Sequence, residues 1–430
     1  MTDASRGRAG GFGDWLPGAA GRRRGVGDAL LGTFEAWGYG LVATPLVEPV
    51  DTIAAGVGAG KQTQLFRFMD ADGSLLALVG ERTVSVARVV ATQLREGPFP
   101  LRLCYLGPVL RNQPLLGGRR RETLQAGCEL IGAPGVGADA ECVGLAADAL
   151  GRAGVTAVQI DVGHADFLPG LLEGAGLDEA TQERVLGALR DRDLVAVEAA
   201  LQDTPVGEVE RSLLLRFPAL RGDREILDAA ASGLRALRPR RALDELGELW
   251  DLLVAHGLAG SIHLDLGAVR DWDYYTGPTF ELFTGDLGFP LGVGGRYDTL
   301  LSRLGLVCPA TGFVLAVDRC CDVLARRDGS WTTVPDALRL GFAVGAAALA
   351  VGVARRLRAA GLRVAGELES RSKAPGGDLD VFVAGPAETS WRDASGWQTG
   401  SVDEAVIALA VPTDAARRTG ADRVGSGERR

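Results

Sequence analysis

One cluster of polar side chains that could carry chemistry lies on two expected strands, 101–111 and 122–131. Arg111 ends the first strand, while Gln125 and Glu129 stand four residues apart on the second and therefore point to the same face. An arginine, an amide and a carboxylate on one sheet face suit a binding site for a polar ligand. They also suit a solvated sheet face, and the residues alone leave both interpretations open.

A second cluster is the segment 270–277 (RDWDYYTG). Arginine pairs with carboxylates in bidentate fashion, and the tyrosines offer flat walls with hydroxyl tips, so this segment suits a pocket for a small anionic or zwitterionic ligand. Aromatic core packing with a surface arginine is the alternative. The glycine-rich segment 292–298 (GVGGRYD) lacks the strand and helix context of a dinucleotide fingerprint, and it indicates a backbone packed closely against a ligand.

The cysteines and histidines indicate neither a metal site nor a disulfide framework. Six cysteines include no Cys-x-x-Cys pair, and the three histidines have no metal-ligand spacing beside them. We therefore expect buried free thiols in a reducing cytoplasm, with no metal and no cofactor. No paired-carboxylate, Ser-His-Asp or Cys-His arrangement is recognisable, and Cys320 and Cys321, at the start of an expected helix, are interpreted as inert.

Composition limits the protein classes that remain. The chain has 430 residues, 47% apolar and 23% charged, which is typical of a globular protein with two or three domains. No apolar run approaches the roughly 20 residues of a membrane helix, and residues 1–15 lack the apolar core of a signal peptide. The formal net charge of −9 argues weakly against a nucleic-acid-binding protein.

The elements that must position the two clusters follow from periodicity and turn signals. Helices are expected at 27–37, 83–96 (capped by Thr83), 139–153, 318 onward, 347–360 and 402–409. A hairpin is expected over 64–79 with its turn at 71–73. Further strands are expected at 41–45 (with Pro45 at a sheet edge or strand end), 101–111, 122–131, 157–162, 261–267, 278–284, 311–317, 338–344, 362–368 and 379–384.

These elements predict an α+β fold in which an antiparallel sheet is flanked by helices, rather than a parallel βαβ array. We expect one core domain over 1–325, interrupted by a helical insertion at about 166–260. Residues 326–336 are interpreted as a linker, 337–412 as a small α/β domain, and the polar, Arg-rich tail 413–430 as disordered.

Taken in order, five segments resemble the class II aminoacyl-tRNA synthetase core in its histidyl branch. Residues 13–17 (GDWLP) resemble the N-terminal signature of that branch, and 34–48 resemble the motif 1 helix and strand. Residues 105–132 resemble motif 2, whose arginine would be Arg111. Residues 270–277 resemble the histidine-binding motif, and 312–319 (GFVLAVDR) resemble motif 3.

Two kinds of protein share this core: histidyl-tRNA synthetase and the synthetase-like regulatory subunit of ATP phosphoribosyltransferase. In the synthetase motif 2 reads Arg-x-Glu, whereas here Gln113 takes the place of that ATP-binding carboxylate. Val79 and Gly80 replace an arginine and a proline, and Ala316 replaces a motif 3 glycine. The expected C-terminal domain is also short and has few basic side chains, although a tRNA reader needs many of them.

The resemblance implies a retained histidine pocket beside a weakened nucleotide site. By the motif match, Glu81 and Thr83 would bind the α-ammonium, Gln125 would support the ligand, Glu129 and Tyr274 would face the imidazole, and Arg270 and Tyr275 would complete the wall. The remnant of the nucleotide site would comprise Arg111, Gln113, Arg121 and Arg319. Arg121 and Arg319 match ATP-binding arginines of the synthetase, and structural salt bridging is the alternative role for them.

We therefore expect a non-catalytic regulatory subunit of ATP phosphoribosyltransferase, the first enzyme of histidine biosynthesis. It would activate the short catalytic subunit as its partner and sense histidine as an effector. It would form a homodimer through the motif 1 segment around Pro45, within a hetero-oligomer, and bind neither membranes nor tRNA. The alternative is an active histidyl-tRNA synthetase with a divergent motif 2.

Overall fold

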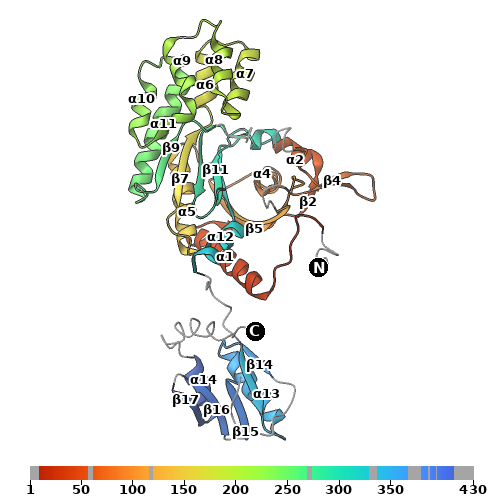
Figure 1. Ribbon diagram of the computed structural model, residues 1–430. Helices are drawn as coiled ribbons and strands as arrows, with labels where there is room; N and C mark the ends of the chain where they lie inside the picture. Colours follow the sequence, from red (N-terminus) through yellow and green to blue (C-terminus); the bar gives the residue numbers. More distant parts are fainter. Residues whose placement is uncertain are drawn as a thin grey trace, which may run out of the picture. The chain divides into compact units, whose positions relative to one another are not determined.

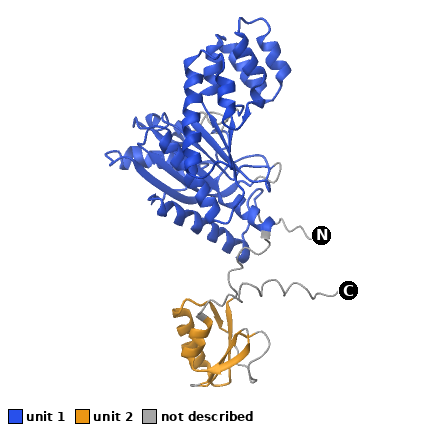
Figure 2. Cartoon of the chain, turned by 90° about the vertical axis from the view of Figure 1, so that its left-hand side faces the viewer, with its two compact units in different colours: residues 1–329 blue, residues 330–430 orange. Residues whose placement is uncertain are grey.

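In the computed structural model the chain divides into two compact units, Met1–Gly329 and Ser330–Arg430, coloured separately in Figure 2. The structure describes residues 9–56, 62–115, 120–268, 274–328, 337–366, 379–385, 388–393 and 395–410. Among these residues no helix is both long enough and apolar enough to cross a membrane. The expected tail at 413–430 lies outside the described residues.

The centre of the first unit is a nine-stranded sheet in the order β1-β5-β6-β12-β11-β10-β7-β9-β8. Neighbouring strands are antiparallel except for the pairs β1–β5 and β7–β9. This arrangement confirms the predicted antiparallel α+β fold. The strands are β1 (Gly40–Leu41), β5 (Leu101–Leu110), β6 (Glu122–Ile131), β7 (Gln159–His164), β8 (Arg221–Gly222), β9 (Ile262–Asp265), β10 (Pro278–Phe283), β11 (Gly292–Arg296) and β12 (Ala310–Ala316).

Three helices pack together with the central strands: α1 (Pro17–Ala36), α5 (Val136–Arg152) and α12 (Val317–Asp328). Their apolar side chains, among them Leu30, Phe34 and Leu145, are fully buried. Because α12 extends to Asp328, residues 326–328 belong to this helix rather than to the expected linker. The run of strong helix formers at 324–327 (LARR) explains why the helix continues past residue 325.

A smaller layer contains the helix α4, which begins directly after Glu81. A three-stranded sheet is formed by β2 (Val47–Pro49), β3 (Arg67–Met69) and β4 (Leu75–Leu78), and β3 and β4 confirm the predicted hairpin. The layer also contains α2 (Val50–Gly56) and α4 (Arg82–Gln93). Val84, Ala87 and Val90 of α4 share a core cluster with Ile131 and with the short η3 helix (Leu301–Leu304). Figure 1 shows β5 curving round α4.

Two local predictions near this layer are wrong. The expected strand 41–45 is reduced to the edge strand β1, and Pro45 lies beyond it because proline cannot donate to a ladder. Thr83 does not cap α4, since the N-cap position is Glu81 and no side-chain capping bond is made there. Thr83 is instead buried in the first turn, beside Tyr105 and Glu129.

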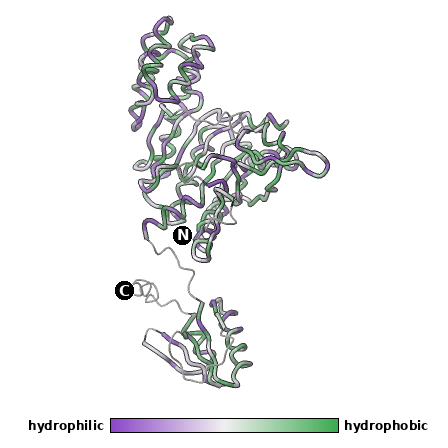
Figure 3. Tube along the Cα trace, turned by 45° about the vertical axis from the view of Figure 1, so that its right-hand side comes forward, coloured by the Kyte–Doolittle hydropathy of each residue, from purple (hydrophilic) through white to green (hydrophobic). Residues whose placement is uncertain are grey.

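The expected helical insertion is a module of six helices that returns to the sheet through β8 and β9. Figure 3 shows purple and green alternating along these helices, as expected for amphipathic helices that bury one face. Within the module Arg238 pairs with Asp166, and His164 at the end of β7 contacts Glu245 at 3.0 Å. The helices are α6 (Phe167–Gly174), α7 (Glu179–Arg190), α8 (Leu194–Leu201), α9 (Glu208–Leu215), α10 (Glu225–Ala231) and α11 (Leu237–Ala255), with a short η2 helix (Phe217–Ala219) before β8.

The second unit contains a five-stranded sheet in the order β14-β13-β15-β16-β17. β13 pairs parallel with both β14 and β15, and β16 and β17 extend the sheet antiparallel. The last two strands were not predicted, because they are rich in polar residues and glycine. The elements are β13 (Leu338–Phe342), α13 (Ala347–Ala359), β14 (Val364–Gly366), β15 (Val381–Gly385), β16 (Glu388–Asp393), β17 (Gly396–Gly400) and α14 (Val402–Ala410).

Candidate functional site

Glu129 lies in the middle of the large sheet, on β6 between β5 and β12. Its partners in register are Leu103 and Gly312, and the residue is 1% exposed. Gly312 makes room for the carboxylate, because a Cβ atom at that position would collide with Glu129 Oε2. The hydroxyl of Tyr297, which follows β11, donates a hydrogen bond to the same oxygen.

The environment of Glu129 favours its neutral form. Burial raises the pKa of the Glu129 carboxyl group to about 8, and the nearby Glu81 charge acts in the same direction. The hydrogen bond from Tyr297 and the nearby hydroxyl groups of Thr83 and Tyr105 lower this pKa but do not overcome the effect of burial. At neutral pH the protonated form of this carboxyl group is therefore favoured.

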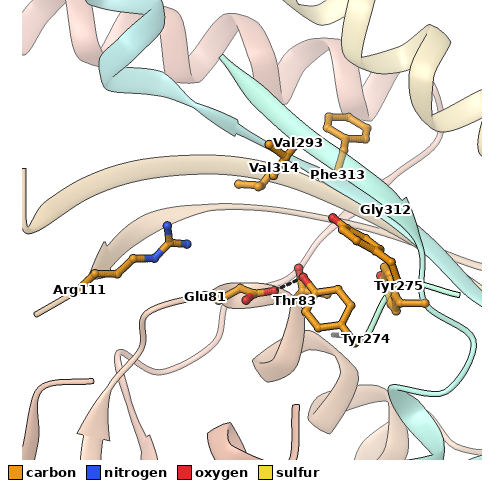
Figure 4. A pocket seen from close by; sticks show the side chains of 10 residues that line it. Glu81, Thr83, Arg111, Tyr274, Tyr275, Val293, Gly312, Phe313 and Val314 are labelled. Atoms are coloured by element: carbon orange, nitrogen blue, oxygen red, sulfur yellow. Dashed lines mark hydrogen bonds between the residues drawn. The ribbon is translucent and has the colours of Figure 1, made fainter. Parts of the chain in front are cut away.

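Glu81 is the second buried acid of the site, in an extended conformation immediately before α4. The Tyr274 hydroxyl donates a hydrogen bond of 2.5 Å to its Oε1 atom, as the dashed line in Figure 4 shows. Tyr274 in turn makes edge contacts with Tyr275, at 4.9 Å between ring centroids, and with Tyr297, at 5.8 Å. Two carboxyl groups are thus surrounded by a tyrosine cluster.

These side chains line a small pocket shown in Figure 4. Its free volume is about 10 Å³, roughly the space that a single water molecule needs. An amino acid can therefore enter only if side chains such as Tyr274 move. The lining residues are Glu81, Thr83, Arg111, Tyr274, Tyr275, Val293, Tyr297, Gly312, Phe313 and Val314.

The structure brings together most of the residues that the resemblance assigned to a histidine pocket. Glu81, Thr83, Tyr274 and Tyr275 line it, and Glu129 contacts it through Tyr297. Gln125 is buried one step away, on the wall of the neighbouring cleft. Arg270 lies outside the described residues.

A larger cleft adjoins the pocket and shares Arg111, Val293 and Val314 with it. Its volume is about 570 Å³, and five of its lining residues are arginines. The nucleotide-site remnant that the motifs predicted (Arg111, Gln113, Arg121 and Arg319) lies here, together with Arg120 and Arg326. The carboxylates on the same wall are Glu281, Asp318 and Asp322, so cations are in excess and the cleft suits an anionic group.

The polar side chains of this cleft are held by backbone carbonyl groups. Arg111 Nε donates to Gly80 O at 2.8 Å, and Arg121 Nε donates to Gln113 O at 3.1 Å. The Gln113 amide donates to Arg120 O at 2.7 Å. At the position where the synthetase motif has a carboxylate, this chain therefore has an amide that is used to shape its own loop.

Sequence reasoning missed two residues that support the site. Trp15 contacts the guanidinium groups of Arg23 and Arg120, which lie 4.7 and 4.9 Å from the centre of its ring. Tyr297 was quoted only as part of a glycine-rich segment. The signal that could have identified Tyr297 is its position directly after residues 292–296 (GVGGR), a segment that the sequence pattern assigns to neither a helix nor a turn.

Residues 292–296 of the glycine-rich segment form β11, and Gly292 and Val293 line the larger cleft, so the interpretation of 292–298 as backbone packed against a ligand stays a prediction. The glycines of β11 do allow close approach, but the neighbours are mainly protein: Leu315 beside Gly292 and Phe280 beside Gly294. At the end of β11 the Arg296 guanidinium pairs with Asp139 at 2.9 Å, and the two side chains are only 7% and 2% exposed. The central strands are thereby tied to α5.

All six cysteines are buried and free, and in the described part of the chain no group of three His, Cys, Asp or Glu side chains is placed to hold a metal ion. The carboxyl groups of Glu81 and Glu129 accept hydrogen bonds from the hydroxyl groups of Tyr274 and Tyr297, respectively. The arrangement can bind a small ligand that carries both positive groups and N–H donors.

A family model described as histidyl-tRNA synthetase matches residues 11–320. A relative from Geobacter sulfurreducens, named ATP phosphoribosyltransferase regulatory subunit, is 41% identical over 315 residues, 73% of this chain and 72% of the relative. A relative of the same name from Moorella thermoacetica is 39% identical over 365 residues, 84% of this chain and 92% of the relative.

Solved structures share the fold of this chain. One from Bacillus halodurans, described as an ATP phosphoribosyltransferase regulatory subunit/histidyl-tRNA synthetase, has a TM-score of 0.77 and 28% identity, and covers 88% of this chain and 98% of that chain. Histidyl-tRNA synthetase from Nostoc sp. PCC 7120 has a TM-score of 0.75 and 18% identity, covering 93% of this chain and 98% of that chain. The second likeness shows the shared fold alone.

Proposed function

Because the chain belongs to the family of ATP phosphoribosyltransferase regulatory subunits built on the histidyl-tRNA synthetase fold, we propose that it activates a short catalytic subunit and senses histidine. The observation that carries this proposal is the identity of 34–41% to relatives of that name. The family assignment supports a regulatory role in histidine biosynthesis. The proposed setting is the cytoplasm, where free thiols such as those of the six cysteines stay reduced.

The site supports sensing rather than catalysis. Glu81 suits the α-ammonium group of histidine, Glu129 suits the ring N–H, and Arg111 lines the pocket as a partner for the carboxylate. Gln113 offers the adjoining cleft no carboxylate, and its amide is bonded to Arg120 O. An acid-lined amino-acid pocket beside an altered nucleotide site fits a receptor for free histidine.

We expect Glu129→Ala to weaken histidine binding roughly tenfold to a hundredfold. The variant would leave the imidazole donor unpaired in a desolvated pocket, which costs on the order of 1–3 kcal/mol. Arg319→Ala is the matched control, because Arg319 lies on the cleft wall, stacked on Phe289 at 5.5 Å. Titration calorimetry of both variants with L-histidine measures the effect. Loss of binding in Arg319→Ala with unchanged binding in Glu129→Ala would show that histidine occupies the cleft instead.

We expect the chain to co-purify with a short catalytic subunit and to raise its ATP phosphoribosyltransferase turnover. Turnover is measured with and without this chain, and with added histidine. The same preparation should not charge tRNA. The retained Arg121 and Arg319 favour the alternative, an active histidyl-tRNA synthetase. Histidine-dependent pyrophosphate exchange followed by tRNA charging would establish that alternative and refute the regulatory proposal.

The proposal includes a homodimer through the segment around Pro45. β1 is an edge strand of the large sheet, and the neighbouring side chains Leu41 and Leu46 are 58% and 36% exposed. Met69 on the β3–β4 hairpin is 66% exposed. Apolar side chains gathered beside an unpaired edge are typical of a surface that a second copy covers. A molar mass of one chain by light scattering at micromolar concentration would refute the dimer.

A further inference from the structure

Two buried cysteines face each other across neighbouring strands of the large sheet. Cys104 of β5 and Cys128 of β6 are partners in register, and both side chains are fully buried. Both thiols are free. Directly opposed residues of an antiparallel pair alternate between a hydrogen-bonded and a non-hydrogen-bonded kind, and the side chains lie closer together in the second kind. The backbone hydrogen bonds nearby show which kind this pair is.

The hydrogen bonds on the β5 side make the two cysteines a non-hydrogen-bonded pair. Just beyond the two strands, Arg111 N donates to Arg121 O at 2.8 Å in the same register, so that pair is hydrogen-bonded. Cys104 lies an odd number of positions before Arg111, and alternation therefore leaves it without a hydrogen bond to Cys128. In agreement, Cys104 O accepts a hydrogen bond from Val42 N at 2.8 Å, which turns its backbone groups toward β1 and away from β6.

The β12 side gives the same result for Cys128. Gly132 N donates to Pro309 O at 2.7 Å and continues the register of β6 and β12, so alternation makes Cys128 a hydrogen-bonded partner of Phe313. Its backbone groups therefore point away from β5. The Cα atoms of a non-hydrogen-bonded pair lie about 4.5 Å apart, and a disulfide bond joins Cα atoms about 4.4–6.8 Å apart. The sheet thus places the two sulfur atoms on one face within reach of a bond.

We propose that Cys104 and Cys128 are a redox modification site, which forms a reversible cross-strand disulfide bond with hydrogen peroxide as the oxidant. The Cys104 thiolate attacks one peroxide oxygen, the O–O bond breaks, and a sulfenic acid and hydroxide are formed. The Cys128 thiol then displaces the sulfenic oxygen as water and closes the S–S bond. Two thiols and one peroxide give one disulfide and two water molecules, so two electrons pass from sulfur to oxygen.

Cys104 is the member of the pair that an oxidant reaches first. It lies beside the two-residue edge strand β1, whereas Cys128 lies on β6 with β5 and β12 on either side. The Cys104 thiol donates to Tyr39 O at 3.8 Å, in the short connection between α1 and β1, so local opening of that connection uncovers it. Burial raises the pKa of Cys104 to about 11, and oxidation is therefore slow compared with that of an exposed thiol.

The bond would lie behind one wall of the pocket. Tyr105 and Glu129 follow the two cysteines in the sequence, and alternation along the strands places them on the opposite face of the sheet. In a reducing cytoplasm both thiols stay free, and the bond would form only under oxidative stress, as is typical of redox-sensing disulfides in that compartment. This inference does not depend on whether the pocket binds histidine.

Peptide mapping of the full chain tests the proposal. The reduced protein is treated with hydrogen peroxide in native buffer, unfolded, alkylated and digested with trypsin. We expect peptide 103–111 to be linked to peptide 122–152 with the loss of two hydrogen atoms, and dithiothreitol should separate them. The second peptide also contains Cys142, whose thiol lies close to Cys128. Cys142→Ala is therefore the matched control and should form the link like the wild type, whereas Cys128→Ala should not.

The other outcomes contradict the proposal. A link that is lost in Cys142→Ala but kept in Cys128→Ala would show that the pairing inferred from the register is wrong. Alkylation of all six cysteines after peroxide treatment, while a urea-unfolded sample is oxidised by the same reagent, would show that the native chain does not form the bond. Urea unfolding of the linked protein should keep its cooperative transition. Loss of that transition would place the bond in an unfolded chain and overturn the proposal as well.

Discussion

Replacement of Arg296 by methionine is expected to lower the free energy of unfolding by about 3–5 kcal/mol. The Arg296 guanidinium lies between Asp139, Asp298 and the carbonyl oxygen of Gly135, and its side chain is 7% exposed. Without it, Asp139 on α5 would be a buried acid without its cation. Removing one partner of a buried ion pair is much more destabilising than replacing both.

The effect of Arg296→Met should grow with pH. Burial already raises the pKa of Asp139 to about 6, and Arg296 lowers it again. Loss of the arginine raises this pKa further, so above about pH 6 the folded variant keeps a proton that the folded wild type and the unfolded chain have released, and the destabilisation is larger at pH 8 than at pH 5. Arg152→Met is the matched control, since Arg152 and Asp148 form an exposed pair that contributes less than about 1 kcal/mol. Urea unfolding that shows equal losses for the two variants would contradict the prediction.

The difference in free energy of unfolding between Glu129→Gln and the wild type is expected to shift in favour of the variant as the pH rises from 5 to 8. The folded pKa of about 8 lies above the unfolded value near 4.5. Between these two values the unfolded chain has released a proton that the folded chain keeps, so wild-type stability decreases as pH rises through this window. The slope approaches about 1.4 kcal/mol per pH unit, the value for one proton. Glutamine has no such proton, and its hydrogen-bonding shape resembles that of the neutral acid.

Glu404 provides the control for this experiment because its pKa shifts in the opposite direction. Ser401 donates to its carboxylate from the backbone N–H and from the hydroxyl, which lowers the pKa. Stability from this bond is present above the unfolded pKa and is lost as pH falls below it. Glu404→Gln should therefore change the stability curve only on the acid side. A Glu129→Gln curve parallel to that of the wild type from pH 5 to 8 would refute the raised pKa.

Local patterns were sufficient to predict the elements that hold the site. The alternation of apolar and polar residues predicted β5 and β6 within one residue of their ends, and the Ala71-Asp72-Gly73 turn predicted the β3–β4 hairpin. β11 was not predicted as a strand because three of its five residues are glycines, which have low strand propensity. The space beside them is filled by Phe280 and Leu315 from neighbouring strands, and no local pattern encodes this packing.

The motifs predicted which side chains lie near one another but not the contacts between them, and their role in binding histidine stays a prediction. Motif order identified Glu81, Thr83, Glu129, Tyr274 and Tyr275, and the structure places them within one neighbourhood. The bond from Tyr297 to Glu129 joins residues 168 positions apart, so only the pairing of β6, β12 and β11 brings them together. The near-closed pocket also depends on side-chain packing, which periodicity does not describe.

The burial of all six cysteines has a practical consequence for fluorescence experiments. Burial raises the pKa of each thiol, which keeps the reactive thiolate scarce at neutral pH. A maleimide dye should therefore react far faster with a cysteine engineered at an exposed position than with any native one. A label at Leu115, which is 48% exposed on the loop after β5, would place a reporter beside the arginine-lined cleft without a cysteine-free background.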